Sequence, residues 1–196
     1  MPTTLRHRLG SLAISSLLVL AACDLDSGGE GEAELASDES ESEGEPAQPI
    51  DLIDPGAWLA TAAELDPLAD HRPETVICPT AAYQLEFGLL EVDTGQCNYL
   101  SVSQPLAHAI DPGDPLRVTV WWQTLIAGEP AEGHLALLVD DELLWETHVA
   151  IPGEAELRQV EFTSPITVEP GATLTFHLHN HGYNSWTLGG LELLDR

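Results

Sequence analysis

The chain has 196 residues and a formal net charge of −27, from 33 acidic residues and six arginines, with no lysine. It offers no basic patch to neutralise phosphates, which excludes nucleic acid as a partner, and an anionic lipid surface would repel it. Cationic partners, neutral sugars and divalent metals remain compatible with this charge.

Residues 1–22 have the features of an export signal. Arg6 and Arg8 precede an apolar run that ends at Ala22, and this run is shorter than the ~20 residues of a membrane-spanning helix. It closes with Leu20-Ala21-Ala22-Cys23, which resembles the lipobox of bacterial lipoproteins. The resemblance implies cleavage before Cys23, a diacylglycerol on its sulfur and an acyl chain such as palmitate on its new amino group. An ordinary signal peptide with a chance cysteine is the alternative.

Residues 23–53 predict a lipidated cysteine followed by a disordered acidic tether. The segment consists largely of Glu, Ser, Gly and Asp, and it cannot bury enough apolar surface to fold. Because two or more acyl chains hold a protein stably on a bilayer, we expect a lipid-anchored protein of the cell envelope, outside the cytoplasm. The inner membrane, the outer membrane and the cell surface remain open. Weak calcium binding by the tether is a minor alternative.

Residues 54–196 predict one all-β domain with one short helix at its start. Asp54 and Pro55 suit the N-cap and first position of that helix, in which Trp58, Ala62 and Leu65 fall at helical spacing. Turn-forming residues then recur about every ten positions, which favours a β-sandwich of jelly-roll or Greek-key type with about eight or nine strands. We expect strands near 83–92, 97–103, 116–125, 134–139, 143–151, 157–163, 172–180 and 186–193, with a hairpin turn at Asp140-Asp141-Glu142.

Two of these strands begin in the same way. Ile110-Asp111-Pro112-Gly113 and Val168-Glu169-Pro170-Gly171 each precede a run of alternating apolar residues. Pro-Gly fits the two central positions of a type II turn, because glycine accepts the positive φ of the second one. Alternation after each turn indicates a strand with one buried face; the apolar residues are Leu116, Val118 and Val120 after the first turn, and Leu174, Phe176 and Leu178 after the second.

The pattern resembles that of the galactose-binding-like jelly rolls, a group that includes many carbohydrate-binding modules. Three features carry the resemblance: the Pro-Gly-x-x-Leu strand entries, a late polar loop and the closing strand Leu188–Leu193. The resemblance covers residues 75–196 and implies a non-catalytic domain that binds a glycan. The calcium ligands that such modules often carry are not recognisable in this sequence.

The two remaining cysteines predict a disulfide. Once Cys23 is lipidated, Cys78 and Cys97 are left, and two cysteines outside the cytoplasm most simply pair. A free or metal-bound pair is the alternative.

The strand at 172–180 brings histidines to one face. Residues two apart share a face of a strand, so the face opposite Phe176 carries His177, His179 and His181. Imidazoles at this spacing can bind zinc or copper. A further ligand would come from His108, His134, His148 or an acid. The alternative is a polar strand face that ends in a hydrogen-bonded loop.

The loop after this strand is the predicted ligand edge. Aromatic faces stack on sugar rings and amides bond hydroxyls, and the edge combines both with the histidines: His177, His179, Asn180, His181, Tyr183, Asn184 and Trp186. The alternative is that Tyr183 and Trp186 pack in the core while the asparagines satisfy backbone groups at a tight corner. Trp121 and Trp122 lie on opposite faces of one strand, so one of them is expected in the core.

No nucleophile elbow or phosphate-binding glycine loop occurs in the sequence, so we expect no enzyme activity. The leading hypothesis is a membrane-anchored exported lipoprotein whose non-catalytic domain binds a glycan or another exported protein and needs no cofactor. One alternative is a metal-binding lipoprotein that uses zinc or copper, and another is a purely structural domain. The sequence makes no prediction of the oligomeric state.

Overall fold

The computed structural model describes residues 48–195. The predicted signal peptide, Cys23 and most of the tether lie outside the described residues. Ile50 to Ile53 lie within the predicted tether but belong to the folded part: Ile50 and Asp51 form strand β1 (Ile50–Asp51), and Leu52 and Ile53 are buried in the core. Within the described residues, no helix is long and apolar enough to cross a membrane.

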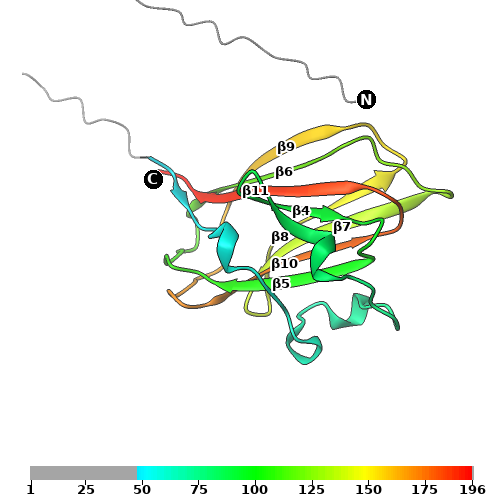
Figure 1. The fold of residues 1–196 in the computed structure, drawn as a ribbon. Helices are drawn as coiled ribbons and strands as arrows, with labels where there is room; N and C mark the ends of the chain where they lie inside the picture. Colours follow the sequence, from blue (N-terminus) through cyan, green and yellow to red (C-terminus); the bar gives the residue numbers. More distant parts are fainter. Residues whose placement is uncertain (1–47, 196) are drawn as a thin grey trace, which may run out of the picture. The chain divides into compact units, whose positions relative to one another are not determined.

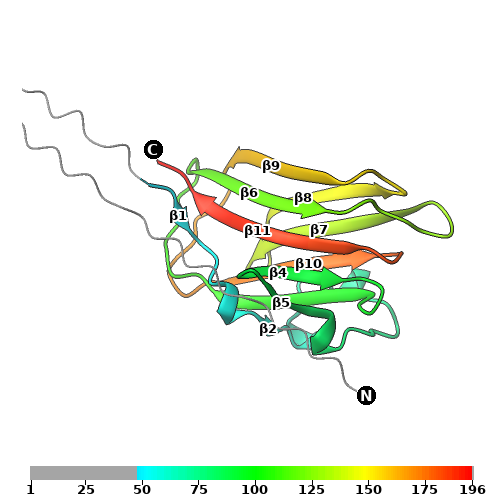
Figure 2. The ribbon, with the colours of Figure 1, turned by 45° about the horizontal axis from the view of Figure 1, so that its top comes forward.

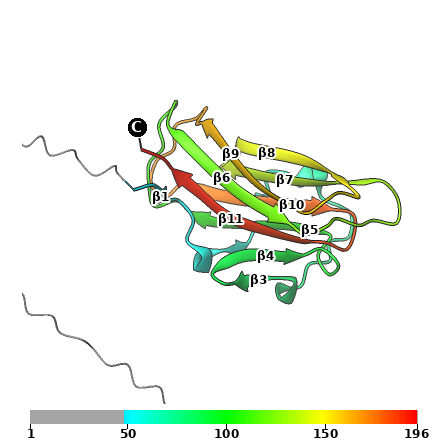
Figure 3. The same cartoon turned by 90° about the horizontal axis from the view of Figure 1, so that it is seen from above.

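The described residues form two antiparallel sheets packed face to face, which confirms the predicted all-β sandwich (Figures 1 and 2). In sheet A the strands run in the order β3 (Tyr83–Glu86), β4 (Leu89–Asp93), β11 (Ser185–Leu193), β6 (Pro115–Trp122) and β9 (Glu156–Thr163), with β1 paired to the end of β11 (Figure 3). In sheet B the order is β2 (Leu59–Ala60), β5 (Tyr99–Pro105), β10 (Thr173–Asn180), β7 (Ala131–Val139) and β8 (Glu142–Ile151).

The predicted strand at 83–92 is in fact a hairpin of β3 and β4. The chain reverses at Phe87 and Gly88, whose φ angles are 51° and 82°. Two consecutive residues with positive φ are typical of the tight hairpin turn whose twist matches that of its strands. The turn carries an apolar residue, Phe87, which is exposed at its tip. The apolar pattern therefore continues through the turn, and for this reason the sequence predicted a single strand.

The predicted N-terminal helix is limited to short 3-10 turns. Asp54 caps η1 (Pro55–Ala57) as expected, because its carboxylate accepts a hydrogen bond from the backbone of Gly56 at 2.9 Å. The chain then extends into β2, so Trp58, Ala62 and Leu65 do not share a helix. Three more 3-10 turns follow: η2 (Ala63–Leu65), η3 (Ala69–His71) and η4 (Thr80–Ala82).

The two Pro-Gly turns lead into strands of opposite sheets. Gly113 and Gly171 have φ angles of 93° and 94°, as type II turns require. The turns are joined to each other, because Ile110 and Val168 exchange backbone hydrogen bonds of 3.0 and 2.8 Å. The predicted inward residues of both strands are buried and form the centre of the core: Leu116, Val118, Val120, Leu174, Phe176 and Leu178.

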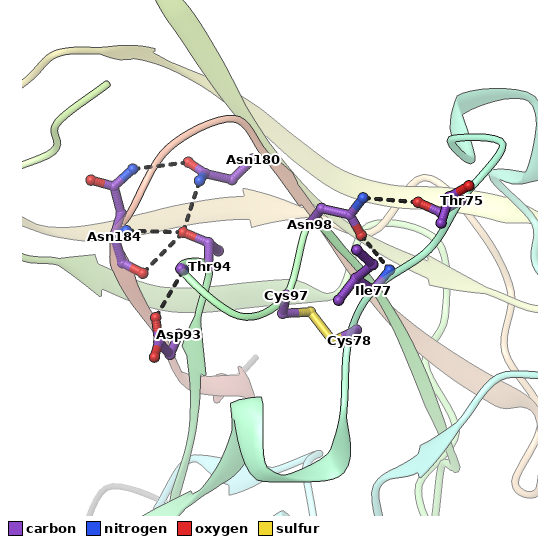
Figure 4. Close-up of a disulfide and its surroundings, with 10 residues drawn as sticks. Thr75, Ile77, Cys78, Asp93, Thr94, Cys97, Asn98, Asn180 and Asn184 are labelled. Atoms are coloured by element: carbon purple, nitrogen blue, oxygen red, sulfur yellow. Dashed lines mark hydrogen bonds between the residues drawn. A yellow bond between two sulfur atoms is a disulfide. The ribbon is translucent and has the colours of Figure 1, made fainter. Parts of the chain in front are cut away.

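Residues 61–78 pack against the outer face of sheet B, next to β5 (Figure 1). Asp66 fastens this segment: its carboxylate accepts hydrogen bonds from Tyr99 (2.7 Å) and Ser101 (3.2 Å) of β5 and pairs with Arg72 at 2.9 Å. The structure also confirms the predicted disulfide between Cys78 and Cys97, which ties the end of the segment to the start of β5 (Figure 4). This outer face, which alternation alone would leave to solvent, is therefore partly buried.

Candidate functional site

The outer face of sheet A carries a row of side chains that crosses five strands. Trp121 of β6 lies opposite Leu157 on one side and Thr187 on the other. Thr187 in turn lies opposite Glu91, and Glu91 opposite Gln84. Cross-strand partners point to the same side of a sheet, and their neighbours Val92, Trp122 and Trp186 are buried in the core. The row therefore faces away from the core.

Part of this row lines a surface depression of about 250 Å³. It lies over the β3–β4 hairpin, β11 and the end of β6, and it combines two aromatic rings with carboxylates, hydroxyls and an amide. The lining residues are Glu86, Phe87, Leu89, Glu91, Trp121, Gln123, Ser185 and Thr187. Sites that bind small molecules commonly have this composition: apolar walls and a few polar groups that fix orientation.

A glycine on β11 makes room for Trp121. The pairing of β11 with β6 shifts register between Leu188 and Gly190, and Gly189 sits at this irregularity. A Cβ atom at Gly189 would lie 2.5 Å from Cζ3 of Trp121 and 3.0 Å from Cγ2 of Thr119. The Trp121 ring therefore lies directly over the backbone of β11, close to the sheet, and a side chain at position 189 would push it away.

Phe87 and Glu91 both line the depression. Phe87 is 95 % exposed at the tip of the hairpin, where it contributes nothing to the core. Exposed apolar groups that gather at one place on a surface mark interaction sites. Among the polar lining residues, the hydroxyl of Ser185 donates a hydrogen bond to the Glu91 carboxylate, which orients the carboxylate to accept further bonds.

The predicted ligand edge at 180–186 is only partly on the surface. Asn180 and Asn184 are buried and hold the corner itself together. The side-chain N–H of Asn184 donates to the side-chain oxygen of Asn180, and Asn180 donates to the Thr94 hydroxyl at 2.8 Å (Figure 4). The side-chain oxygen of Asn184 accepts a hydrogen bond from the backbone N–H of Ile126 at 2.6 Å. Trp186 is fully buried, and it packs on Trp122 and over Gly133.

Tyr183 and His181 remain exposed at this edge. Tyr183 is 76 % exposed. Together with Gly182 and Ala127–Ala131, the two line an open hollow of about 360 Å³. This hollow has one aromatic ring and mostly small neighbours, so it offers a ligand fewer fixed groups than the depression on sheet A.

The three histidines of β10 and its following loop have different surroundings. His177 is completely buried on the outer side of sheet B, beneath residues 61–78, and its ring lies 5.1 Å from His134 and 4.8 Å from Tyr99. His179 is partly buried, and its ring lies 4.7 Å from that of His181. One ring nitrogen from each of His71, His134 and His177 lies within 4.8 Å of the other two, and His134 forms a second such group with Glu146 and His148. Burial lowers the pKa of His177 to about 3 and also lowers those of His134 and His179.

No protein-family model and no curated protein matches the chain. Among solved structures it is similar to TmCBM27, a carbohydrate-binding module studied for specific mannan recognition, at 9 % identity and a TM-score of 0.47, over 77 % of this chain and 97 % of the module. It is similar to a CBM4 structure at 10 % identity and a TM-score of 0.43, over 72 % and 89 %. A match to the Agl-KA catalytic domain, at 12 % identity and a TM-score of 0.36, covers 55 % of this chain but only 21 % of that one.

Proposed function

We propose that this domain is a non-catalytic module that binds a neutral glycan on the outer face of sheet A. The observation that carries the proposal is the depression lined by Phe87 and Trp121, with Glu91, Gln123 and Thr187 among its polar lining residues. The apolar face of a sugar ring stacks on an aromatic ring, and its hydroxyls need both donors and acceptors. The depression supplies all three kinds of contact on a rigid sheet.

The charges of the domain favour a neutral glycan over an anionic one. From Asp51 onward the sequence has 23 acidic residues against four arginines. Each arginine in the described part of the chain is already ion-paired: Arg72 with Asp66, Arg117 with Glu161 and Glu192, and Arg158 with Glu156. None of them lines the depression. Sulfated or uronic-acid chains would therefore meet carboxylates without a cation to bind them.

Replacing Trp121 by alanine should weaken glycan binding about 30-fold, as removal of a central aromatic anchor does. The measurement is affinity electrophoresis and calorimetry against a panel of neutral and acidic polysaccharides. Tyr183→Ala, at the hollow beside the loop, is the control and should bind like the wild type. If Tyr183→Ala loses binding and Trp121→Ala keeps it, the site lies at the loop edge and the proposal is wrong.

A pair of glycines gives a second test at the same site. Gly189→Ala should displace the Trp121 ring and weaken binding, because its Cβ would collide with that ring. Gly190→Ala is the matched control, since a Cβ at position 190 would meet nothing within 4 Å. Equal affinities for the two variants would show that the position of Trp121 does not matter for binding.

We also propose that lipid on Cys23 displays the domain on a membrane outside the cytoplasm. The support is the lipobox-like Leu20-Ala21-Ala22-Cys23 and the short apolar run before it. Cys23→Ser should move the protein from the membrane fraction to the soluble fraction of cells that express it, because the acyl chains are lost. A Cys23→Ser protein that stays with the membranes would show that the lipid is not the anchor.

A further inference from the structure

His177 is a buried side chain whose ring nitrogens lack hydrogen-bond partners. It is completely inaccessible to solvent, and neither Nδ1 nor Nε2 has a hydrogen-bond partner. A buried imidazole without partners destabilises a fold, and an apolar residue of similar size would be better at the same position. A histidine kept there at this cost points to a ligand that uses its ring nitrogens.

The sheet register assembles other histidines around it. Across the outer face of sheet B, His134 of β7 lies opposite His179 of β10 and His148 of β8. His177 occupies the next row, and His71 arrives from η3 on the covering segment, with its ring 5.5 Å from that of His134. One ring nitrogen from each of His71, His134 and His177 lies within 4.8 Å of the other two.

The arrangement of these rings suits metal binding, because one ring nitrogen of each lies near those of the other two. A metal bound to three nitrogens at 2.0–2.1 Å needs them about 3.3 Å apart, so the three rings would move closer together when they bind one ion. His134 also contacts Glu146, with Nε2 to carboxylate oxygen at 3.1 Å. A carboxylate on one ring nitrogen commonly orients a histidine that binds metal through the other.

We propose that His71, His134 and His177 bind one zinc or copper ion, on the sheet opposite the glycan face. Three imidazoles favour these metals over calcium, which prefers oxygen ligands. The ligands come from the covering segment, β7 and β10, so the metal would hold residues 61–78 against sheet B. This inference does not depend on glycan binding, because it rests on different residues.

The test is thermal unfolding and calorimetry of the mature, tag-free chain, with zinc or copper added as the chloride and then removed by a chelator. We expect one ion per chain and a reversible rise in the melting temperature. His71→Ala, on the exposed turn, should lose most of this rise. His177→Leu should also lose it, yet melt higher than the metal-free wild type, because two unpartnered nitrogens are removed.

His181→Ala is the matched control. His181 is an exposed histidine near the same sheet and outside the proposed ligand set, so this variant should respond to metal like the wild type. No rise for the wild type at stoichiometric metal would overturn the proposal. An equal rise for wild type, His71→Ala and His177→Leu would overturn it too, and loss of the rise in His181→Ala alone would assign the metal to other ligands.

Discussion

Replacing Asp66 by alanine should lower the free energy of unfolding by about 3 kcal/mol or more. The Asp66 side chain is completely buried. It accepts hydrogen bonds from the hydroxyls of Tyr99 and Ser101, from the backbone of Leu68 and from Arg72. Alanine would leave the serine hydroxyl buried without this acceptor, weaken the bonding of the tyrosine and release the arginine.

Urea denaturation of Asp66→Ala and Asp66→Asn separates the causes. Asparagine keeps one carbonyl acceptor and the shape of the side chain, so it should cost less than alanine. Hydrogen exchange should rise in residues 61–78 of the alanine variant, because Asp66 fastens that segment to β5. A stability loss below about 1 kcal/mol for Asp66→Ala would show that the segment is held mainly by the disulfide and apolar contacts.

Replacing Thr94 by valine should cost about 2–3 kcal/mol, although the two side chains have nearly the same shape. The Thr94 hydroxyl accepts hydrogen bonds from the Asn180 amide at 2.8 Å and from the backbone N–H of Asn184 at 3.0 Å, and it donates to the carbonyl of Asn184 (Figure 4). Valine cannot accept, so it would leave the buried N–H of Asn184 without this partner.

Thr94→Ser is the matched control for this prediction. Serine keeps the hydroxyl and loses only a methyl group, which is worth about 0.8 kcal/mol. Equilibrium unfolding of the two variants gives the comparison directly. Equal losses for valine and serine would mean that packing of the methyl group, and not the hydrogen-bond network, stabilises the corner at 180–184.

The strands and turns of the sandwich were largely predictable from the sequence, because their signals are local. Pro-Gly fixes the geometry of its own turn, and alternation in 116–122 and 174–178 reports which residues face the core. The hairpin at Phe87 was missed because its turn carries an exposed aromatic residue in place of a polar one. The disulfide followed from the two cysteines that remain once Cys23 is assigned to the predicted lipid.

The candidate sites were less predictable, because they depend on contacts between distant parts of the chain. Alternation correctly turned His177 away from the sandwich core, but it could not reveal that residues 61–78 cover that face. The sequence likewise placed Trp121 and Trp122 on opposite faces. Only the pairing of β6 with β11 and β9 shows that Trp121 shares an outer row with Thr187 and Leu157.

The loop at 180–186 shows how the same residue types can serve two purposes. Amides and aromatic rings close together in sequence are typical of a sugar site, yet they are also typical of a tight corner. Here the two asparagines bond each other and the backbone, while Trp186 fills the core. The residues that remain for a ligand at this edge are His181 and Tyr183.

The central claim is that a neutral glycan binds the outer face of sheet A, and mapping of amide chemical shifts by nuclear magnetic resonance tests it most directly. The isotope-labelled protein is titrated with a fragment of a polysaccharide that it binds. This should shift the signals of Glu91, Trp121, Thr187 and the hairpin around Phe87, while the signals of sheet B stay unchanged. Shifts confined to His181, Tyr183 and Ala127–Ala131, or to the histidine face of sheet B, would contradict the claim.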